Sequence, residues 1–172
     1  MNVLLTGEPG IGKTTVCRMV LDYTETNVEG FVTEELRDNG ERVGFLVQFQ
    51  NGSSKVLSHV EYDDPSVGKY GVDRKTMDWV VEQLYQILER QPEGLVIDEI
   101  GKMELIHDDF PKVVSEALKS PVDTLATVPT SGPDFVEEIK TREDSSLFEL
   151  TEENRDEVPE TVVRKLGWGN DT

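Results

Sequence analysis

The chain has 172 residues, 36% of them hydrophobic, and its 35 acidic and 17 basic residues give a formal net charge of −18. This length and composition predict one domain over residues 1–172 with a packed core. The strong acidity argues against general binding to nucleic acid or to an anionic membrane, because both need basic surfaces.

No apolar run approaches the roughly 20 residues of a membrane span, and the chain begins with a core segment rather than a signal peptide. We therefore expect a cytoplasmic protein without a membrane partner. The sequence leaves the oligomeric state open, and a monomer is our expectation. The single cysteine, Cys17, excludes an internal disulfide, and the two histidines lack the clustering of a zinc site. Acids are spread along the whole chain, which suggests an acidic coat adapted to high salt.

Residues 3–5 (VLL) form a short apolar segment that predicts a buried strand, and residues 15–23 carry an apolar helical face that ends at Tyr23. Between them, residues 7–14 (GEPGIGKT) fit the phosphate-loop pattern G-x-x-x-x-G-K-[ST]. A strand before the loop and a helix after it are the context that this pattern requires.

The residue types of this loop suit a triphosphate. Gly7, Gly10 and Gly12 let the backbone curve tightly and approach phosphate without side chains in the way. Successive N–H groups and the helix N-terminus then form a nest for an anion. Lys13 adds positive charge for the β- and γ-phosphates, and the Thr14 hydroxyl can ligate Mg²⁺. A plain glycine turn with a solvated Lys13 is the alternative.

The next segment predicts an antiparallel β-meander. Residues 28–37, 41–50 and 54–60 have strand character, and the turn signals DNG at 38–40 and NG at 51–52 separate them. A hairpin layer inserted after a phosphate-loop helix is less usual than a plain βαβ crossover. We expect it to cover one edge of the nucleotide cleft.

The second half of the chain alternates strands with helices after a loop at residues 61–71. In order we expect a helix capped by Asp73 and ended at residues 91–94, a strand at 95–97, a helix at 110–119 capped by Asp108 or Asp109, a strand at 122–128, a helix starting at Pro133, a strand at 146–150 and a last helix after Pro159 that stops at Gly167. This alternation predicts an α/β fold with a mostly parallel sheet covered on both faces.

Residues 95–99 (LVIDE) have the form of a Walker B segment, an apolar strand with acids at its carboxyl end. Open α/β sheets bind ligands at that end. Asp98 is placed to hold Mg²⁺, and Glu99 to orient and deprotonate a water against the γ-phosphate. Two surface acids at a strand end are the alternative. Residues 98–101 also satisfy the D-x-x-G of small GTPases, but no guanine-selective N-K-x-D follows.

Six segments together carry a resemblance to one family. They are GEPGIGKTT at 7–15, GFVTEELRDNGERVGF at 30–45, VGKYGVD at 67–73, LVIDEIGKMEL at 95–105, LATV at 125–128 and TEENRDEVP at 151–159. The chain resembles the small P-loop nucleoside-triphosphate phosphatases first described in thermophiles, which are related in animals to the cancer-related NTPase. DEIGKMEL is far more particular to this family than the phosphate loop is.

The resemblance implies a RecA-like or AAA-like α/β core and Mg²⁺-dependent hydrolysis of ATP, GTP and other triphosphates to diphosphate and phosphate. It implies Lys13 and Glu99 as catalytic residues and Thr14 and Asp98 as magnesium ligands. The expected nucleotide-binding residues are Gly7, Glu8, Pro9, Gly10, Ile11, Gly12, Lys13, Thr14, Thr15, Leu95, Val96, Ile97, Asp98, Glu99, Ile100, Gly101, Lys102 and Arg155. Within the second stretch, the strand residues support the site while Asp98, Glu99 and Lys102 face it.

Several alternatives stay open. A nucleotide or polynucleotide kinase could use the same scaffold, although residues 130–145 hold only two basic residues for an acceptor lid. A nucleotide-dependent switch with negligible turnover is a third class. Arg155 could touch the base or the γ-phosphate, or form a helix-cap salt bridge. Arg142 could act as an arginine finger or lie on the surface, and Glu34, Glu35 and Arg37 could line the cleft or an exposed strand.

Overall fold

The structure, a computed structural model, describes residues 1–63 and 65–169. Its strands are β1 (Asn2–Thr6), β2 (Val28–Asp38), β3 (Glu41–Phe49), β4 (Ser54–His59), β5 (Ser66–Val67), β6 (Tyr70–Val72), β7 (Gly94–Ile97), β8 (Asp123–Thr127) and β9 (Ser145–Glu149). Its helices are α1 (Lys13–Tyr23), α2 (Arg74–Arg90), α3 (Phe110–Lys119), α4 (Asp134–Lys140) and α5 (Val158–Leu166), with a 3₁₀ turn η1 (Glu104–Ile106). In this part of the chain the strands form one sheet in the order β5-β6-β4-β3-β2-β7-β8-β1-β9.

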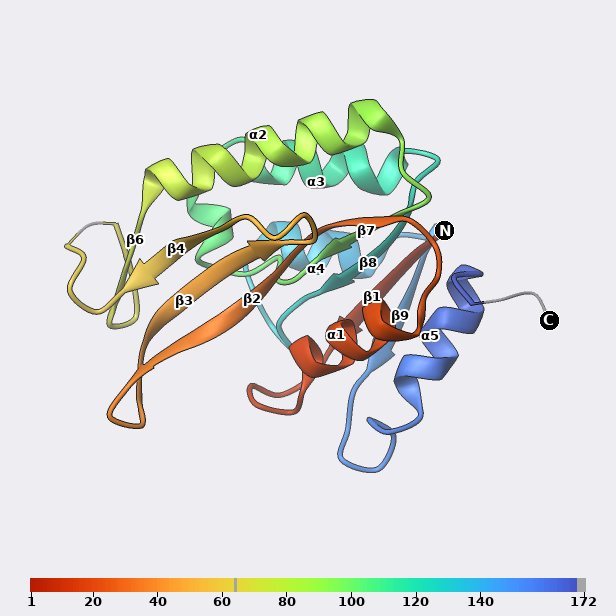
Figure 1. Cartoon of the computed structure of the whole chain (residues 1–172), viewed down its shortest axis with the longest axis horizontal. Coiled ribbons are helices and arrows are strands. Elements are labelled where there is room, and N and C mark those ends of the chain that lie inside the picture. The colour runs from red at the N-terminus through yellow and green to blue at the C-terminus, as the bar shows by residue number, and fades with distance from the viewer. Residues whose placement is uncertain (64, 170–172) are drawn as a thin grey trace.

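The half of the sheet that contains β1 is parallel, as the sequence predicts. Strands β2, β7, β8, β1 and β9 run in the same direction, and every residue of β1 and β7 is buried. Parallel strands read as continuous apolar runs because helices cover both of their faces (Figure 1). Among the described residues, no helix has both the length and the apolar character to cross a bilayer.

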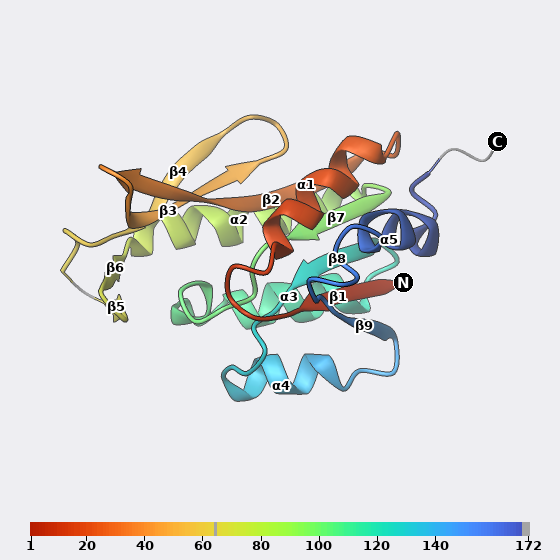
Figure 2. The same ribbon diagram turned by 90° about the horizontal axis from the view of Figure 1, so that it is seen from below.

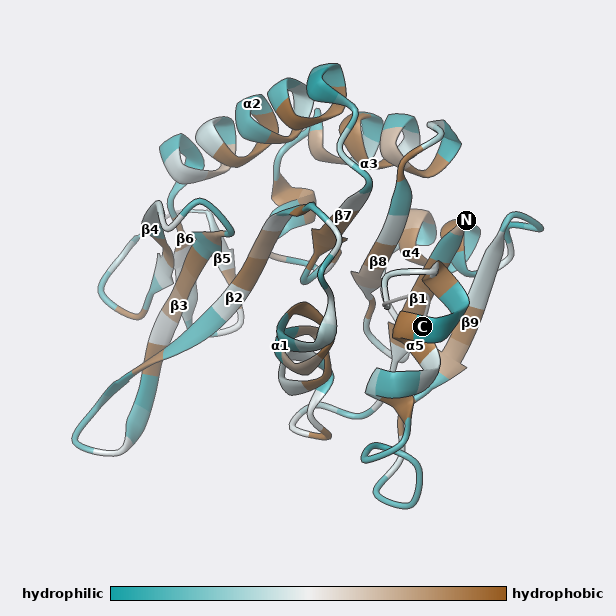
Figure 3. Cartoon of the chain, turned by 45° about the vertical axis from the view of Figure 1, so that its right-hand side comes forward, coloured by the Kyte–Doolittle hydropathy of each residue, from teal (hydrophilic) through white to brown (hydrophobic). Residues whose placement is uncertain are grey.

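Successive side chains of one strand enter two different cores. Leu4 and Ile97 pack with α2, α3 and α4, whereas Val3 and Val96 pack with α1 and α5 on the other face. This alternation follows from the two-residue period of a strand. In Figure 3 the apolar colour accordingly runs along the strands and the inward sides of the helices.

The order of the parallel strands positions the site. Strand β8 lies between β1 and β7, and Ala126 of β8 pairs with Leu4 on one side and with Ile97 on the other. The carboxyl ends of β1 and β7 are therefore level at one edge of the sheet. The loop after β1 and the acids after β7 meet there, one strand apart, at the edge where open α/β sheets bind ligands.

The meander predicted for residues 28–60 is confirmed. Strand β2 pairs antiparallel with β3, and β3 pairs antiparallel with β4. Asn39, Gly40 and Gly52 adopt positive φ angles in the two connecting turns, as tight hairpin turns require. Figure 2 shows the meander extending past α1, with α2 on its other face.

The prediction of a loop over residues 61–71 is wrong for its second part, because residues 66–72 form a small hairpin. Strands β5 and β6 pair with each other, and β6 adds to β4 through Ser58 and Val72. A side chain at Gly71 would overlap the carbonyl oxygen of Tyr62, so the close crossing of this segment needs glycine. Strands of two and three residues are too short to show a hydrophobic period.

One predicted helix cap is confirmed and one is wrong. The Asp73 carboxylate accepts two backbone N–H groups from the first turn of α2. The predicted cap at the start of α3 is missing: among the described residues, neither the Asp108 nor the Asp109 carboxylate accepts a backbone N–H of the first helical turn. Asp109 has a helical backbone rather than the extended one of an N-cap, and its carboxylate bonds instead to the Lys112 ammonium at 3.1 Å.

The inward face of α1 differs from the prediction at its end. Helix α1 already begins at Lys13, and its buried residues are Val16, Cys17 and Val20. Tyr23, the last residue of the predicted apolar face, is 53% exposed, so this face is buried only as far as Val20. Cys17 is buried and packs in the core between α1 and the sheet.

Candidate nucleotide site

The phosphate loop leaves the carboxyl end of β1 and runs through residues 7–12 into α1. Gly10 and Gly12 have φ angles of 81° and 112°, which residues with side chains rarely adopt. A side chain at Gly7 would approach the carbonyl oxygen of Leu150 to 3.0 Å, so the loop also needs glycine where it passes the end of β9. The loop is thus an open concave backbone with the N-terminus of α1 at its base, an arrangement that binds phosphate.

The Lys13 ammonium joins the two halves of the predicted site. Its Nζ donates to the carbonyl oxygens of Gly7 at 3.2 Å and Val128 at 3.3 Å. It also lies 3.4 Å from Oε2 of Glu99, with only 11% of its side chain exposed. The charge is therefore held inside the loop, between the ends of β1, β8 and β7, which contradicts the alternative of a solvated lysine.

Asp98 is buried at the carboxyl end of β7, with 1% exposure. Its Oδ1 accepts the Thr127 hydroxyl at 2.6 Å, and its Oδ2 accepts the Thr33 N–H at 3.3 Å. Burial raises the pKa of Asp98, while hydrogen bonds from the Thr127 and Thr14 hydroxyls and the nearby Lys13 charge oppose the rise. Thr14 and Asp98 therefore lie together and offer hard oxygen ligands.

Glu99 lies at the mouth of the same cluster, with 33% of its side chain exposed. Burial raises the pKa of Glu99, the Lys13 charge opposes this rise, and the Asp98 charge adds to it. A carboxyl group with a raised pKa and access to solvent is suited to take a proton from water. Since Asp98 is buried and Glu99 faces Lys13, the pair does not match two surface acids at a strand end.

Three groups that complete the cluster were not predicted from the sequence. They are the Thr127 hydroxyl, the Thr33 N–H and the Val128 carbonyl, which bond to Asp98 or Lys13. A hydroxyl residue at the carboxyl end of a parallel strand is the signal that could have identified Thr127. The groups from Thr33 and Val128 are backbone atoms that any residue carries, so residue type gives no signal for them.

The two basic residues predicted to face the nucleotide lie in different environments. A guanidinium nitrogen of Arg155 donates to the carbonyl oxygen of Ile11 at 3.4 Å, which places Arg155 against the phosphate loop. Lys102 is an exposed residue of the turn after β7, whereas its neighbours Ile100 and Gly101 are buried. Arg155 therefore borders the loop directly, and Lys102 lies on the surface.

Arg142 lies at the wrong end of the sheet for an arginine finger acting within its own chain. It precedes β9, whose first residue, Ser145, pairs with Asn2 at the start of β1. The phosphate loop follows the opposite end of β1. Arg142 forms an ion pair with Asp144 at 2.6 Å instead, which matches the surface role left open above.

Glu34, Glu35 and Arg37 are exposed on the meander. The Glu35 carboxylate pairs with Arg37 at 2.7 Å and with Arg42 at 3.2 Å, and Nε of Arg42 donates to the Tyr70 hydroxyl at 2.8 Å. These contacts stay within the meander and its β5–β6 extension. They agree with the exposed-strand alternative rather than with a lining of the nucleotide site.

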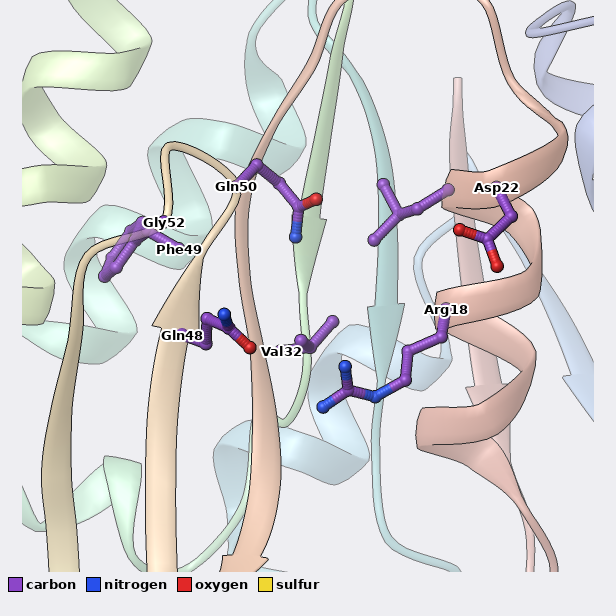
Figure 4. A pocket seen from close by; sticks show the side chains of 8 residues that line it. Arg18, Asp22, Val32, Gln48, Phe49, Gln50 and Gly52 are labelled. Carbon is purple, nitrogen blue, oxygen red and sulfur yellow. The ribbon is translucent and has the colours of Figure 1, made fainter.

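A hollow of about 310 Å³ lies beside the phosphate loop rather than over it, between α1 and the β2–β3 hairpin. Figure 4 shows Arg18 reaching from α1 toward Val32 of β2, with the amides of Gln48 and Gln50 opposite. Arg18 lies one helical turn beyond Thr14. The hollow therefore lies along α1 beyond its first turn, and its lining does not include Lys13, Asp98 or Glu99.

The fold and this cluster define a P-loop nucleoside triphosphatase. A family described as NTPase matches residues 2–163. The chain is 37% identical to the nucleoside-triphosphatase THEP1 of Thermotoga petrophila over 100% of the chain and 98% of the relative. It is also 37% identical to the human cancer-related nucleoside-triphosphatase, over 94% of each chain. The chain belongs to this NTPase family and is an NTPase enzyme.

Solved structures agree with this family. The chain matches the crystal structure of THEP1 from Aquifex aeolicus with a TM-score of 0.85 and 34% identity, covering 96% of this chain and 99% of the other. It matches the solution structure of a human cancer-related nucleoside triphosphatase with a TM-score of 0.79 and 34% identity, over 96% of both chains. The sequence-based resemblance and the predicted α/β P-loop NTPase fold are thereby confirmed.

Proposed function

We propose that the protein hydrolyses nucleoside 5'-triphosphates, ATP and GTP among them, to the diphosphate and phosphate with Mg²⁺ as cofactor. The observation that carries this proposal is the Lys13 ammonium held between the phosphate loop, the end of β8 and the Glu99 carboxylate. It supplies positive charge at the base of an anion nest and places a carboxylate directly beside it. Phosphoryl transfer depends mainly on such positioning and charge stabilisation.

Each group of the cluster has a role in this proposal. The backbone N–H groups of residues 7–14 and the Lys13 ammonium bind the β- and γ-phosphate oxygens. Glu99 accepts a proton from a water as the water oxygen attacks the γ-phosphorus and the bond to the bridging oxygen of the diphosphate breaks. Arg155, against Ile11, borders the side of the loop open to the rest of the nucleotide.

The oxygen groups of Thr14 and Asp98 fit Mg²⁺. Magnesium is usually held by one or two protein oxygens together with substrate phosphates and waters, rather than by a full protein cage. The ion would neutralise phosphate charge during transfer. The hydrogen bonds from Thr127 and Thr33 to Asp98 orient its carboxylate toward the loop in advance.

The kinase alternative has less support from the structure. The segment between β8 and β9 holds Lys140 and Arg142 as its basic residues. Lys140 donates to the Thr130 carbonyl at 2.7 Å, and Arg142 pairs with Asp144 far from the phosphate loop. Both charges are engaged within their own segment rather than presented to an acceptor.

Phosphate release distinguishes the three alternatives. The purified protein is incubated with ATP or GTP and Mg²⁺, with and without nucleoside monophosphates or a 5'-hydroxyl oligonucleotide, and free phosphate and transferred phosphoryl groups are measured. We expect release to water in every mixture and its loss when EDTA removes the metal. Transfer only to an acceptor would support the kinase, and tight binding without turnover would support a switch.

A further inference from the structure

Glu104 is a second buried acid beside the site, apart from Asp98, and the proposed chemistry does not use it. Glu104 is the first residue of the turn η1 and is 4% exposed. Its carboxylate Oε2 accepts the backbone N–H of Gly101 at 3.3 Å. A buried carboxyl group is costly to keep unless it makes a specific contact, so this contact calls for a structural or functional reason.

Gly101 lies directly against Glu99. A Cβ atom at position 101 would overlap Oε1 of Glu99 and come within 3.2 Å of its Cγ and Cδ. The Glu99 side chain therefore lies across the Cα of Gly101, in space that a side chain would occupy. Glycine at position 101 therefore leaves free the space that the Glu99 carboxylate occupies.

The backbone around Gly101 is fixed on both sides. The N–H of Ile100 donates to the Thr127 carbonyl at 2.9 Å, and the N–H of Leu105 donates to the Gly101 carbonyl at 2.9 Å. Glu104 binds the remaining polar group of Gly101, its N–H. The peptide that supports Glu99 is thus hydrogen-bonded to β8, to η1 and to the Glu104 side chain.

We propose that Glu104 is a positioning residue for hydrolysis: its carboxyl group holds the Gly101 amide so that Gly101 supports the Glu99 side chain against the Lys13 ammonium. This rests on the proposed function, in which Glu99 activates water. A misplacement of about 1 Å in a catalytic group lowers turnover on the order of 10²-fold. Triphosphate binding is expected to change far less, because the phosphate loop itself stays intact.

The contact needs a hydrogen-bond acceptor rather than a negative charge. Burial, followed by the nearby Glu99 charge, raises the pKa of Glu104 well above its usual value. A carbonyl oxygen of an uncharged side chain can accept the same N–H. Glutamine has nearly the same shape, so Glu104→Gln preserves the contact while Glu104→Ala removes it.

The test compares kcat with triphosphate affinity in four proteins: wild type, Glu104→Ala, Glu104→Gln and Gly101→Ala. We expect Glu104→Ala to lose about 10- to 100-fold in kcat with ATP affinity within about threefold of wild type. We expect Glu104→Gln to stay within about threefold in kcat. Gly101→Ala keeps Glu104 but pushes the Glu99 carboxylate aside, so we expect the same loss in kcat as in Glu104→Ala.

Three outcomes overturn the proposal: wild-type kcat in Glu104→Ala, equal losses of kcat and affinity in that variant, or a Glu104→Gln protein as slow as Glu104→Ala. If Glu104→Ala does not fold, Gly101→Ala and Glu104→Gln decide the question, and a fully active Gly101→Ala overturns it. Glu99→Gln separates this failure from failure of the proposed function. An active Glu99→Gln removes the water-activating role itself, whatever Glu104 does.

Discussion

The sheet has a parallel half (β2, β7, β8, β1 and β9) and an antiparallel extension, formed by the end of β2 beyond its pairing with β7 and by β3 to β6. The pKa values of acidic residues shift in opposite directions in these two regions. Beside the phosphate loop, burial raises the pKa values of Asp98, Glu99 and Glu104. In the extension, Glu35 is exposed, and hydrogen bonds and charge from Arg37 and Arg42 bring its pKa below the usual value despite the opposing effect of partial desolvation. Among 35 acidic residues, burial rather than abundance distinguishes those of the site.

This contrast has a physical reason. Carboxyl groups that hold a metal or move a proton work best out of bulk water, where neighbouring charges act strongly on them. The Glu35 cluster is exposed, and exposed ion pairs contribute little to stability. We therefore expect substitutions in the site to change chemistry strongly, and substitutions in the extension to change it little.

The largest effect on triphosphate affinity is expected for Lys13→Ala. The variant loses the charge that lies inside the phosphate loop and should bind triphosphate at least about 30-fold more weakly, equivalent to about 2 kcal/mol. Calorimetric titration with a non-hydrolysable triphosphate measures this. Lys112→Ala removes an exposed lysine, 70% accessible, and serves as the control with normal affinity. If Lys13→Ala and Lys112→Ala bound triphosphate with equal affinity, the claim that buried charge matters more than exposed charge would be contradicted.

An intermediate effect is expected for Thr127→Val, which removes the hydroxyl that donates to Asp98 at 2.6 Å with little change in shape. Without this bond the Asp98 carboxylate is less well oriented, and we expect kcat to fall about tenfold, equivalent to about 1.4 kcal/mol of activation free energy. Because that bond lowers the pKa of Asp98, its loss should also move the acid limb of the pH–rate profile to higher pH. An unchanged profile would mean that Thr127 does not act on Asp98.

A smaller effect on stability should have opposite signs in the two regions. A raised folded-state pKa at Glu104 means that its contribution to stability falls as pH rises above the unfolded value of about 4.3. Glu104→Gln should therefore gain stability over wild type between pH 4 and pH 8, as urea unfolding can measure. A lowered folded-state pKa at Glu35 means that its contribution to stability is lost as pH falls. Glu35→Gln should therefore be slightly less stable than wild type at neutral pH and as stable as wild type at about pH 3. If the unfolding free energy of both variants followed the wild-type dependence on pH, the proposed difference between the two regions would be contradicted.

The smallest effect on activity is expected for Arg42→Ala. Arg42 bonds to Glu35 and Tyr70 and lies 5.2 Å from the centre of the Phe45 ring. Its removal should cost about 1 kcal/mol of unfolding free energy, since the side chain is 44% exposed. Phosphate release should stay within about twofold of wild type. A large loss of turnover would show that the extension contributes to the chemistry.

The sequence predicted the parallel half of the sheet better than the β5–β6 hairpin at its opposite edge. The phosphate loop and the strand before Asp98 carry signals within a few residues, so both the elements and their meeting point were predictable. The β5–β6 hairpin was missed because each of its strands is too short to show a period. Thr33 and Val128 act through backbone atoms, which leave no pattern of residue types in the sequence. Glu104 contacts Gly101 only three residues earlier, but its burial depends on the packing of the folded chain, which an acidic residue in the sequence does not indicate.

The most direct test of the central claim is turnover by Glu99→Gln measured alongside ATP affinity. We predict that this variant binds ATP with Mg²⁺ as wild type does, because the loop, Lys13, Thr14 and Asp98 are unchanged. Its phosphate release should fall at least about 10²-fold, the contribution expected of a general base. A Glu99→Gln protein that binds ATP and releases phosphate at the wild-type rate would contradict the account.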